Sequence, residues 1–196
     1  MNIFKDKEKA KVAKKLFALF VAILILFSAI NAIWFLGYQQ RYSHIAKHLD
    51  ATYIDSDEAI GSDLLRYKKD VDEYTITMKM PAYLGLGGFV SVAKTEGYVV
   101  RLDDDGNIIE GSDMYITLYI WPKFFKDYKI GLDFYDEINS VWEQVEFTSE
   151  MEMMNTENLD DDYIKYVEEL VAKYSDEINE LIGVAEKTLE INIRQD

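Results

Sequence analysis

An apolar run near the N-terminus constrains this chain more than any other feature. Residues 16–36 read LFALFVAILILFSAINAIWFL, in which Ser28 and Asn31 are the only polar side chains. A helix rises about 1.5 Å per residue, so this run is long enough to cross the roughly 30 Å hydrocarbon core of a bilayer. A helix of a soluble protein is rarely apolar on every face. The sequence therefore predicts a transmembrane helix over residues 16–38.

The flanks of this run predict its orientation. Six lysines lie in residues 1–15, and the positive-inside rule places such a segment in the cytoplasm. Trp34 and Tyr38 lie near the other end, where interfacial aromatic side chains are found. A cleavable signal peptide is the alternative, but it has a shorter apolar region, and cleavage after Ala32 would leave an apolar new terminus. We expect an uncleaved signal anchor in the cell membrane, with the C-terminal part outside the cytoplasm.

Charge and the absence of cysteine narrow the classes of function. Of 21 basic and 36 acidic residues, six lysines and two acids fall in residues 1–15, which leaves 15 basic and 34 acidic residues, a net charge of −19, for the rest. Such a surface repels the phosphates of nucleic acid, so we expect no nucleic-acid partner. The chain contains no Cys, which excludes disulfides, thiol catalysis and thiolate zinc sites. A bacterial envelope fits a disulfide-free outer domain.

Hydrophobic periodicity predicts the elements of the outer part. The spacing of Tyr38, Tyr42, Ile45 and Leu49 predicts that the anchor continues as a helical stalk, and Asp55 predicts a cap for a short helix at 57–69. Alternating residues then predict strands, with an Asp-Gly hairpin signal at 105–106. After Asn155 the period changes to 3.6, which predicts one helix over 158–190 capped by Asn158. The predicted strands are 73–80, 89–95, 97–102, 114–121, 128–135 and 141–148.

These elements define an α+β fold. It has an N-terminal transmembrane helix and a mostly antiparallel sheet of about six strands packed on a long C-terminal helix, because the strands are consecutive and their links are short. The predicted organisation is a basic cytoplasmic tail at 1–15, a signal anchor at 16–38, a juxtamembrane helical stalk at 39–53 and an extracytoplasmic α+β domain at 54–196.

Aromatic residues are the most informative candidates for a binding surface. The strand at 114–121 is apolar on both sides, which normally means that it is buried on both sides. The alternative is an aromatic face left for a partner, and Tyr and Trp are enriched in interface hot spots. A third interpretation places the loop at 121–126 at the membrane interface. The candidate binding residues are Tyr115, Tyr119, Trp121, Tyr135 and Trp142.

Metal and cofactor signals are weak. His44 and His48 have the spacing at which two imidazoles can hold one ion, but no Cys completes a site. Asp103, Asp105 and Asn107 match the start of a calcium loop, and the pattern then fails, because its sixth position is not Gly and its twelfth is not Glu. A hairpin explains the same residues. We expect no metal and no cofactor.

These observations favour a non-catalytic interaction module, an accessory or scaffold protein of a bacterial envelope that binds a protein partner or itself. One alternative is a ligand-binding or sensing domain for wall glycan or a cation. The other is a carboxylate-based envelope hydrolase. Two histidines, no cysteine and no nucleophile motif argue against an enzyme.

Overall fold

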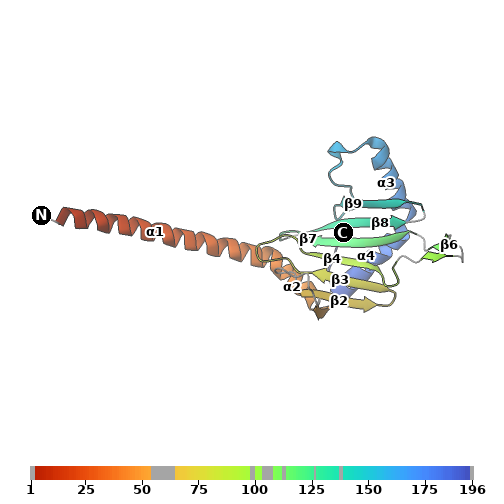
Figure 1. The fold of residues 1–196 in the computed structure, drawn as a ribbon, viewed down its shortest axis with the longest axis horizontal. Helices are drawn as coiled ribbons and strands as arrows, with labels where there is room; N and C mark the ends of the chain where they lie inside the picture. Colours follow the sequence, from red (N-terminus) through yellow and green to blue (C-terminus); the bar gives the residue numbers. More distant parts are fainter. Residues whose placement is uncertain are drawn as a thin grey trace.

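A long N-terminal helix projects from a sheet domain (Figure 1). The structure is a computed structural model that describes residues 3–53, 65–97, 100–102, 108–111, 114–125, 127–136 and 139–194. The calcium-loop candidates Asp103, Asp105 and Asn107, the hairpin signal at 105–106 and the predicted cap Asp55 lie outside these residues.

The N-terminal helix runs without interruption into the domain. It comprises α1 (Ile3–Trp34), a π-helical turn η1 (Phe35–Gln39) and α2 (Gln40–Ala46). Among the described helices it is the one long and apolar enough to cross a membrane. This confirms the predicted long apolar helix at the N-terminus.

The predicted stalk is shorter than expected and is part of the domain. Tyr42, Ile45 and Leu49 are buried in the core, as their spacing predicted. The helix ends at Ala46, and Asp50–Tyr53 form strand β1, so the last part of the segment predicted as a helical stalk is extended. The chain becomes extended there because β1 pairs antiparallel with the next strand.

Seven antiparallel strands form the main sheet in the order β1-β2-β3-β4-β7-β8-β9. This confirms the predicted α+β class and the antiparallel sheet, although the main sheet has seven strands where about six were expected. A two-stranded ribbon, β5 with β6, is inserted between β4 and β7. The strands are β1 (Asp50–Tyr53), β2 (Leu65–Val71), β3 (Tyr74–Lys79), β4 (Phe89–Lys94), β5 (Val100–Leu102), β6 (Ile108–Gly111), β7 (Tyr115–Pro122), β8 (Tyr128–Asp136) and β9 (Val141–Phe147).

Strand β2 corrects the helix predicted at 57–69. Residues 65–68 pair with β1 and residues 66–71 pair with β3, and residues 54–64 lie outside the described part. Tyr67 and Val71 pack against the core from β2. Lys69 Nζ donates a hydrogen bond to the His48 carbonyl oxygen at 3.0 Å. The local sequence of this charged segment favours a helix. Pairing with a strand on each side stabilises it as a strand instead.

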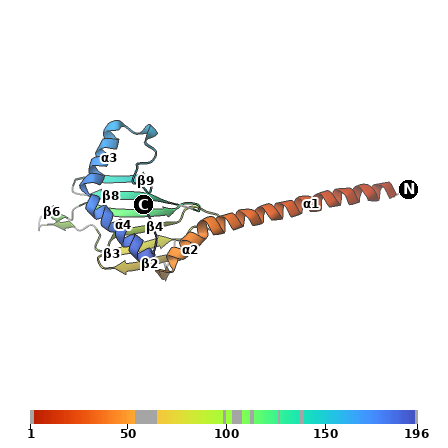
Figure 2. The same cartoon turned by 180° about the vertical axis from the view of Figure 1, so that it is seen from behind.

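The C-terminal region forms two helices instead of the one predicted over 158–190. They are α3 (Asp161–Lys173) and α4 (Ser175–Leu189), separated at Tyr174. Asp160 caps α3 by accepting a hydrogen bond from the Asp162 amide at 2.9 Å, whereas the predicted cap, Asn158, lies in a short 3₁₀ turn, η2 (Thr156–Asn158). Helix α3 lies beside β9 and α4 crosses the sheet (Figure 2), so one straight helix could not make both contacts.

The core lies between the sheet and α4. Alternate residues of the central strands, among them Ile76, Val92 and Leu118, are fully buried. Leu181 and Ile182 of α4 belong to the same core cluster. Because side chains alternate along a strand, the other residues of these strands point to the opposite face of the sheet.

Candidate functional site: the open face of the sheet

The sheet face opposite α4 carries no helix among the described residues. In Figure 1, α4 runs behind the sheet. Along β7 the residues alternate between full burial toward α4 and partial exposure on the other side. We call this second surface the open face. Its main side chains are those of Thr75, Thr77, Phe89, Ser91, Tyr115, Thr117, Tyr119, Trp121, Lys129, Asp133, Tyr135, Trp142 and Gln144.

Strand register brings three aromatic residues into one row. Tyr115 is the partner of Tyr135 across β7 and β8, and Tyr135 is the partner of Trp142 across β8 and β9. With Thr117 and Asp133 they line a hollow of about 370 Å³. Trp142, on the edge strand β9, is 77 % exposed. A large aromatic ring in this position loses little side-chain entropy on binding and offers its whole face to a partner.

Asp133 supplies the charged group of this hollow. Burial raises the pKa of its carboxyl, and a hydrogen bond from the Trp142 side chain acts in the opposite direction. Its Oδ1 atom is buried and makes no hydrogen bond in the described structure. A buried acceptor without a partner is costly. The hollow therefore combines aromatic stacking surfaces with one carboxyl group.

A second aromatic group lies farther along β7. The rings of Tyr119 and Trp121 stack with centroids 5.7 Å apart, and Phe89 packs edge-on against Tyr119. The Trp121 ring lies over Gly131, where a Cβ atom would come within 2.6 Å of it. Lys129 Nζ lies 4.4 Å from the Trp121 ring centroid. Trp121 is thus held by contacts within the sheet, whereas Trp142 is largely exposed.

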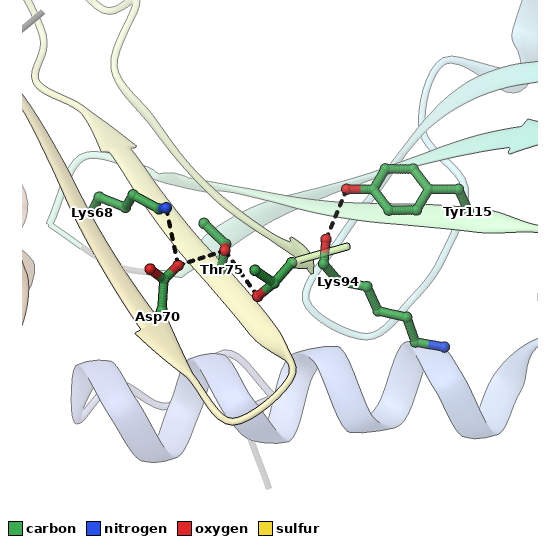
Figure 3. A network of polar contacts seen from close by, with 6 residues as sticks. Lys68, Asp70, Thr75, Lys94 and Tyr115 are labelled. Carbon is green, nitrogen blue, oxygen red and sulfur yellow. Dashed lines mark hydrogen bonds and ion pairs between the residues drawn. The ribbon is translucent and has the colours of Figure 1, made fainter. Parts of the chain in front are cut away.

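A polar hollow of about 360 Å³ adjoins the aromatic one and shares Tyr115 and Thr117 with it. Its hydrogen bonds join neighbouring strands (Figure 3). Thr75 Oγ1 donates to Asp70 Oδ1 at 2.6 Å and lies 3.0 Å from the Thr95 hydroxyl. The Thr75 hydroxyl, with the Lys68 ammonium 3.2 Å from the carboxylate, lowers the pKa of Asp70. These groups satisfy one another, so this part of the face is polar and preorganised.

The hydroxyl of Tyr115 connects the two hollows. It donates to the Lys94 carbonyl oxygen at 3.2 Å. The Lys94 side chain points toward the helix in Figure 3, and its Nζ pairs with Glu177 of α4 at 3.0 Å. The position of the Tyr115 ring is therefore tied to the helical layer behind the sheet.

The structure places all five predicted aromatic residues on the open face. The prediction that Tyr115, Tyr119, Trp121, Tyr135 and Trp142 share one side follows from the period of two, and their role in binding stays a prediction. Sequence reasoning overlooked Asp133 and Phe89. The sequence does contain a signal that places Asp133 on this face. In β8 it stands between two buried residues, so the period of two puts its side chain on the opposite side of the sheet.

The histidine pair lies elsewhere, with His44 on α2 and His48 in the turn that follows it. The ring centroids of His44 and His48 are 5.4 Å apart in an edge-to-face arrangement. Within the described residues no group of three His, Cys, Asp or Glu side chains is placed to hold an ion. Packing of the two rings accounts for their arrangement.

Comparison with protein-family models, with curated proteins and with solved structures finds no match to this chain. The description of the fold and of the open face therefore rests on the sequence and the structure alone.

Proposed function

We propose that this chain is a single-pass membrane protein whose extracytoplasmic domain binds another protein through the open face, as a non-catalytic accessory or scaffold protein of a bacterial envelope. The observation that carries the proposal is the aromatic row of Tyr115, Tyr135 and Trp142 on a sheet face without a described helical cover. Exposed aromatic patches of this kind are typical of interaction sites.

Two observations support a different protein, instead of a second copy, as the partner. Residues 16–196 carry a net charge of −19 by composition, so two outer domains repel each other at close approach. Two lysines on this face are already paired, since Lys129 Nζ lies 2.7 Å from Glu146 Oε1 and Lys68 Nζ lies 3.2 Å from Asp70 Oδ1. A partner with a less acidic surface avoids the repulsion.

A non-catalytic role fits the chemistry of the hollow. Hydrolysis of a glycan by carboxylates needs two of them on either side of the scissile bond. The residues lining the aromatic hollow include one, Asp133. The two histidines of the chain, on α2 and in the turn after it, do not line either hollow.

Site-specific photo-crosslinking in the native membrane tests this proposal. A benzophenone amino acid placed at Trp142 or Tyr119 should capture one discrete protein, whereas the same group at exposed Lys187 of α4 should not. With the probe at Tyr119, Trp142→Ala should reduce the adduct several-fold and Gln144→Ala, on the same strand and face, should not. An adduct of twice the chain's mass, or none from either position in folded protein, would contradict it.

A second candidate function, recognition of wall glycan, is favoured by the exposed Trp142 ring, which lines the same hollow as the Asp133 carboxyl. Aromatic rings stack on sugars, and a carboxylate that lines such a hollow can accept from a sugar hydroxyl. Titration of the full-length chain with soluble wall-glycan fragments should then change its tryptophan fluorescence. Asp133→Ala and Trp142→Ala should each abolish the change, and a change that survives both would place binding elsewhere.

A further inference from the structure

Exposed apolar side chains gather beside the point where the N-terminal helix meets the domain. They belong to two loops, residues 82–86 between β3 and β4 and residues 123–125 between β7 and β8, which we call the interfacial loops. Tyr83 is 63 % exposed, Leu86 61 % and Phe125 65 %. Large apolar side chains this exposed, and this close together, mark an interaction surface.

Contacts with the N-terminal helix fix the position of the first loop along the helix axis. The Tyr83 hydroxyl donates to the side-chain oxygen of Asn31, and the Tyr83 ring packs edge-on against Trp34 with centroids 5.6 Å apart. Trp34 Nε1 donates to the Gly85 carbonyl oxygen at 3.1 Å. The first loop therefore lies alongside residues 31–34 of the helix.

The second loop meets the helix one turn farther on. The Phe125 amide donates to the Gly37 carbonyl oxygen at 3.0 Å, and Phe124 stacks on Tyr38 with centroids 5.2 Å apart. A Cβ atom at Gly37 would come within 2.7 Å of the Phe125 ring. Arg41 donates to the Asp127 carbonyl oxygen at 2.9 Å. These contacts join helix and sheet domain firmly.

The length of the helix places both loops at the outer edge of the bilayer. A span that begins at Leu16 leaves the hydrocarbon core near Leu36, after about 20 residues. Asn31 then lies about 8 Å inside that boundary. Interfacial segments bury their apolar side chains about 5–10 Å deep, which is the depth at which Tyr83 contacts Asn31.

The hydrogen bonding of Asn31 agrees with an apolar environment. Its side-chain nitrogen donates to the Phe27 carbonyl oxygen at 2.7 Å, and its side-chain oxygen accepts from Tyr83. Polar groups in lipid need such partners because water is absent. Tyr83 thus satisfies one of the two polar side chains of the apolar run.

We infer that the interfacial loops insert Tyr83, Leu86 and Phe125 into the outer headgroup boundary of the lipid bilayer. The inference rests on the proposed membrane anchoring. The loops would then hold the sheet domain at a fixed orientation relative to the membrane. The open face would lie close to the outer surface of the bilayer. We assign lipid as the partner of these loops. Their exposed side chains continue the apolar surface of the helix that enters the bilayer.

Spin-label accessibility in pure lipid vesicles tests the inference. The chain has no cysteine, so each label reports one position. The full-length variants Leu86→Cys and Phe125→Cys are labelled and reconstituted in phosphatidylcholine vesicles without other proteins. Their ratio of oxygen to nickel-chelate accessibility should be several-fold higher than that of Gln144→Cys, an exposed position on the open face.

Ile25→Cys, in the middle of the apolar run, separates the two proposals. If Ile25 is shielded from the nickel chelate while Leu86 and Phe125 are as accessible to it as Gln144, the anchoring stands and the loop inference is wrong. If Ile25 is itself accessible, the anchoring fails. Shielding of the loop labels in native membranes but not in pure vesicles would show a protein cover and would overturn the assignment to lipid.

Discussion

Close packing at single residues holds the open face in shape. The Trp121 ring can lie across the sheet because its diagonal neighbour on β8 is Gly131, the register partner of Tyr119, which has no side chain. Aromatic rings packed over a strand glycine replace the contacts that the glycine lacks. Sequence reasoning could place Trp121 on this face from the period of two, but it could not foresee that a glycine on a neighbouring strand receives the ring.

Substitution of this glycine tests the packing. Gly131→Ala places a Cβ atom 2.6 Å from the Trp121 ring, so we expect a loss of stability of about 1–3 kcal/mol from overpacking. Thermal unfolding of the full-length chain in detergent measures it. Gly87→Ala is the control, because a Cβ atom there meets nothing within 4 Å. Equal stability of the two variants would show that Trp121 is not held over Gly131.

Two carboxylates on the open face, those of Asp133 and Asp70, should contribute to the pH dependence of folding stability with opposite signs. The folded state raises the pKa of Asp133 by burial, so its contribution to stability is full below the unfolded pKa and is lost as the pH rises through the folded one. Asp133→Asn removes that penalty. We expect the variant to unfold at a higher temperature than the wild type at neutral pH, and the gain to vanish in acid.

Asp70 provides the matched comparison. Its pKa is lowered by the Thr75 hydroxyl and by Lys68, so its contribution is present above the unfolded pKa and is lost as the pH falls through the folded one. Asp70→Asn should therefore lower the unfolding temperature at neutral pH, with a difference that shrinks in acid. The same sign for both variants at neutral pH would contradict the environments described here.

Among the elements, alternation predicted the central strands and missed the charged strand β2. Strands β3, β4 and β7 carry buried residues at every second position, and β8 and β9 do so over part of their length. Sequence alone reveals this period. Strand β2 carries lysines and an arginine, and pairing with its neighbours decides its conformation. Contacts of this kind join residues distant in sequence, so a local window does not contain them.

The start of α3 is a second case, and it can be tested. The structure gives the cap to Asp160, whereas sequence spacing favoured Asn158. Asp160→Ala should destabilise the chain by about 1 kcal/mol, because it leaves the Asp162 amide without its acceptor. Asn158→Ala should have little effect. Thermal unfolding followed by circular dichroism compares the two, and a larger loss in Asn158→Ala would restore the cap predicted from sequence.

In the whole molecule, the contacts that join the N-terminal helix to the sheet domain, which we call the joint, could not be predicted from the sequence. Hydropathy predicts the helix, and the spacing of Tyr42, Ile45 and Leu49 predicts an apolar stripe beyond it. Neither shows that the loops after β3 and β7 return to the same stretch of helix. The hydroxyl of Tyr42 donates to the Gly88 carbonyl oxygen at 2.7 Å, a contact between segments 46 residues apart. Through this joint the orientation of the helix decides which way the open face points.

Cysteine labelling of intact cells tests whether the open face is presented outside the membrane. Gln144→Cys lies on the open face and Lys11→Cys precedes the apolar run, and the parent chain without cysteine gives no background. A membrane-impermeant maleimide should label Gln144→Cys on intact cells and Lys11→Cys only after lysis. Labelling of Lys11→Cys on intact cells, or protection of Gln144→Cys until lysis, would contradict the account.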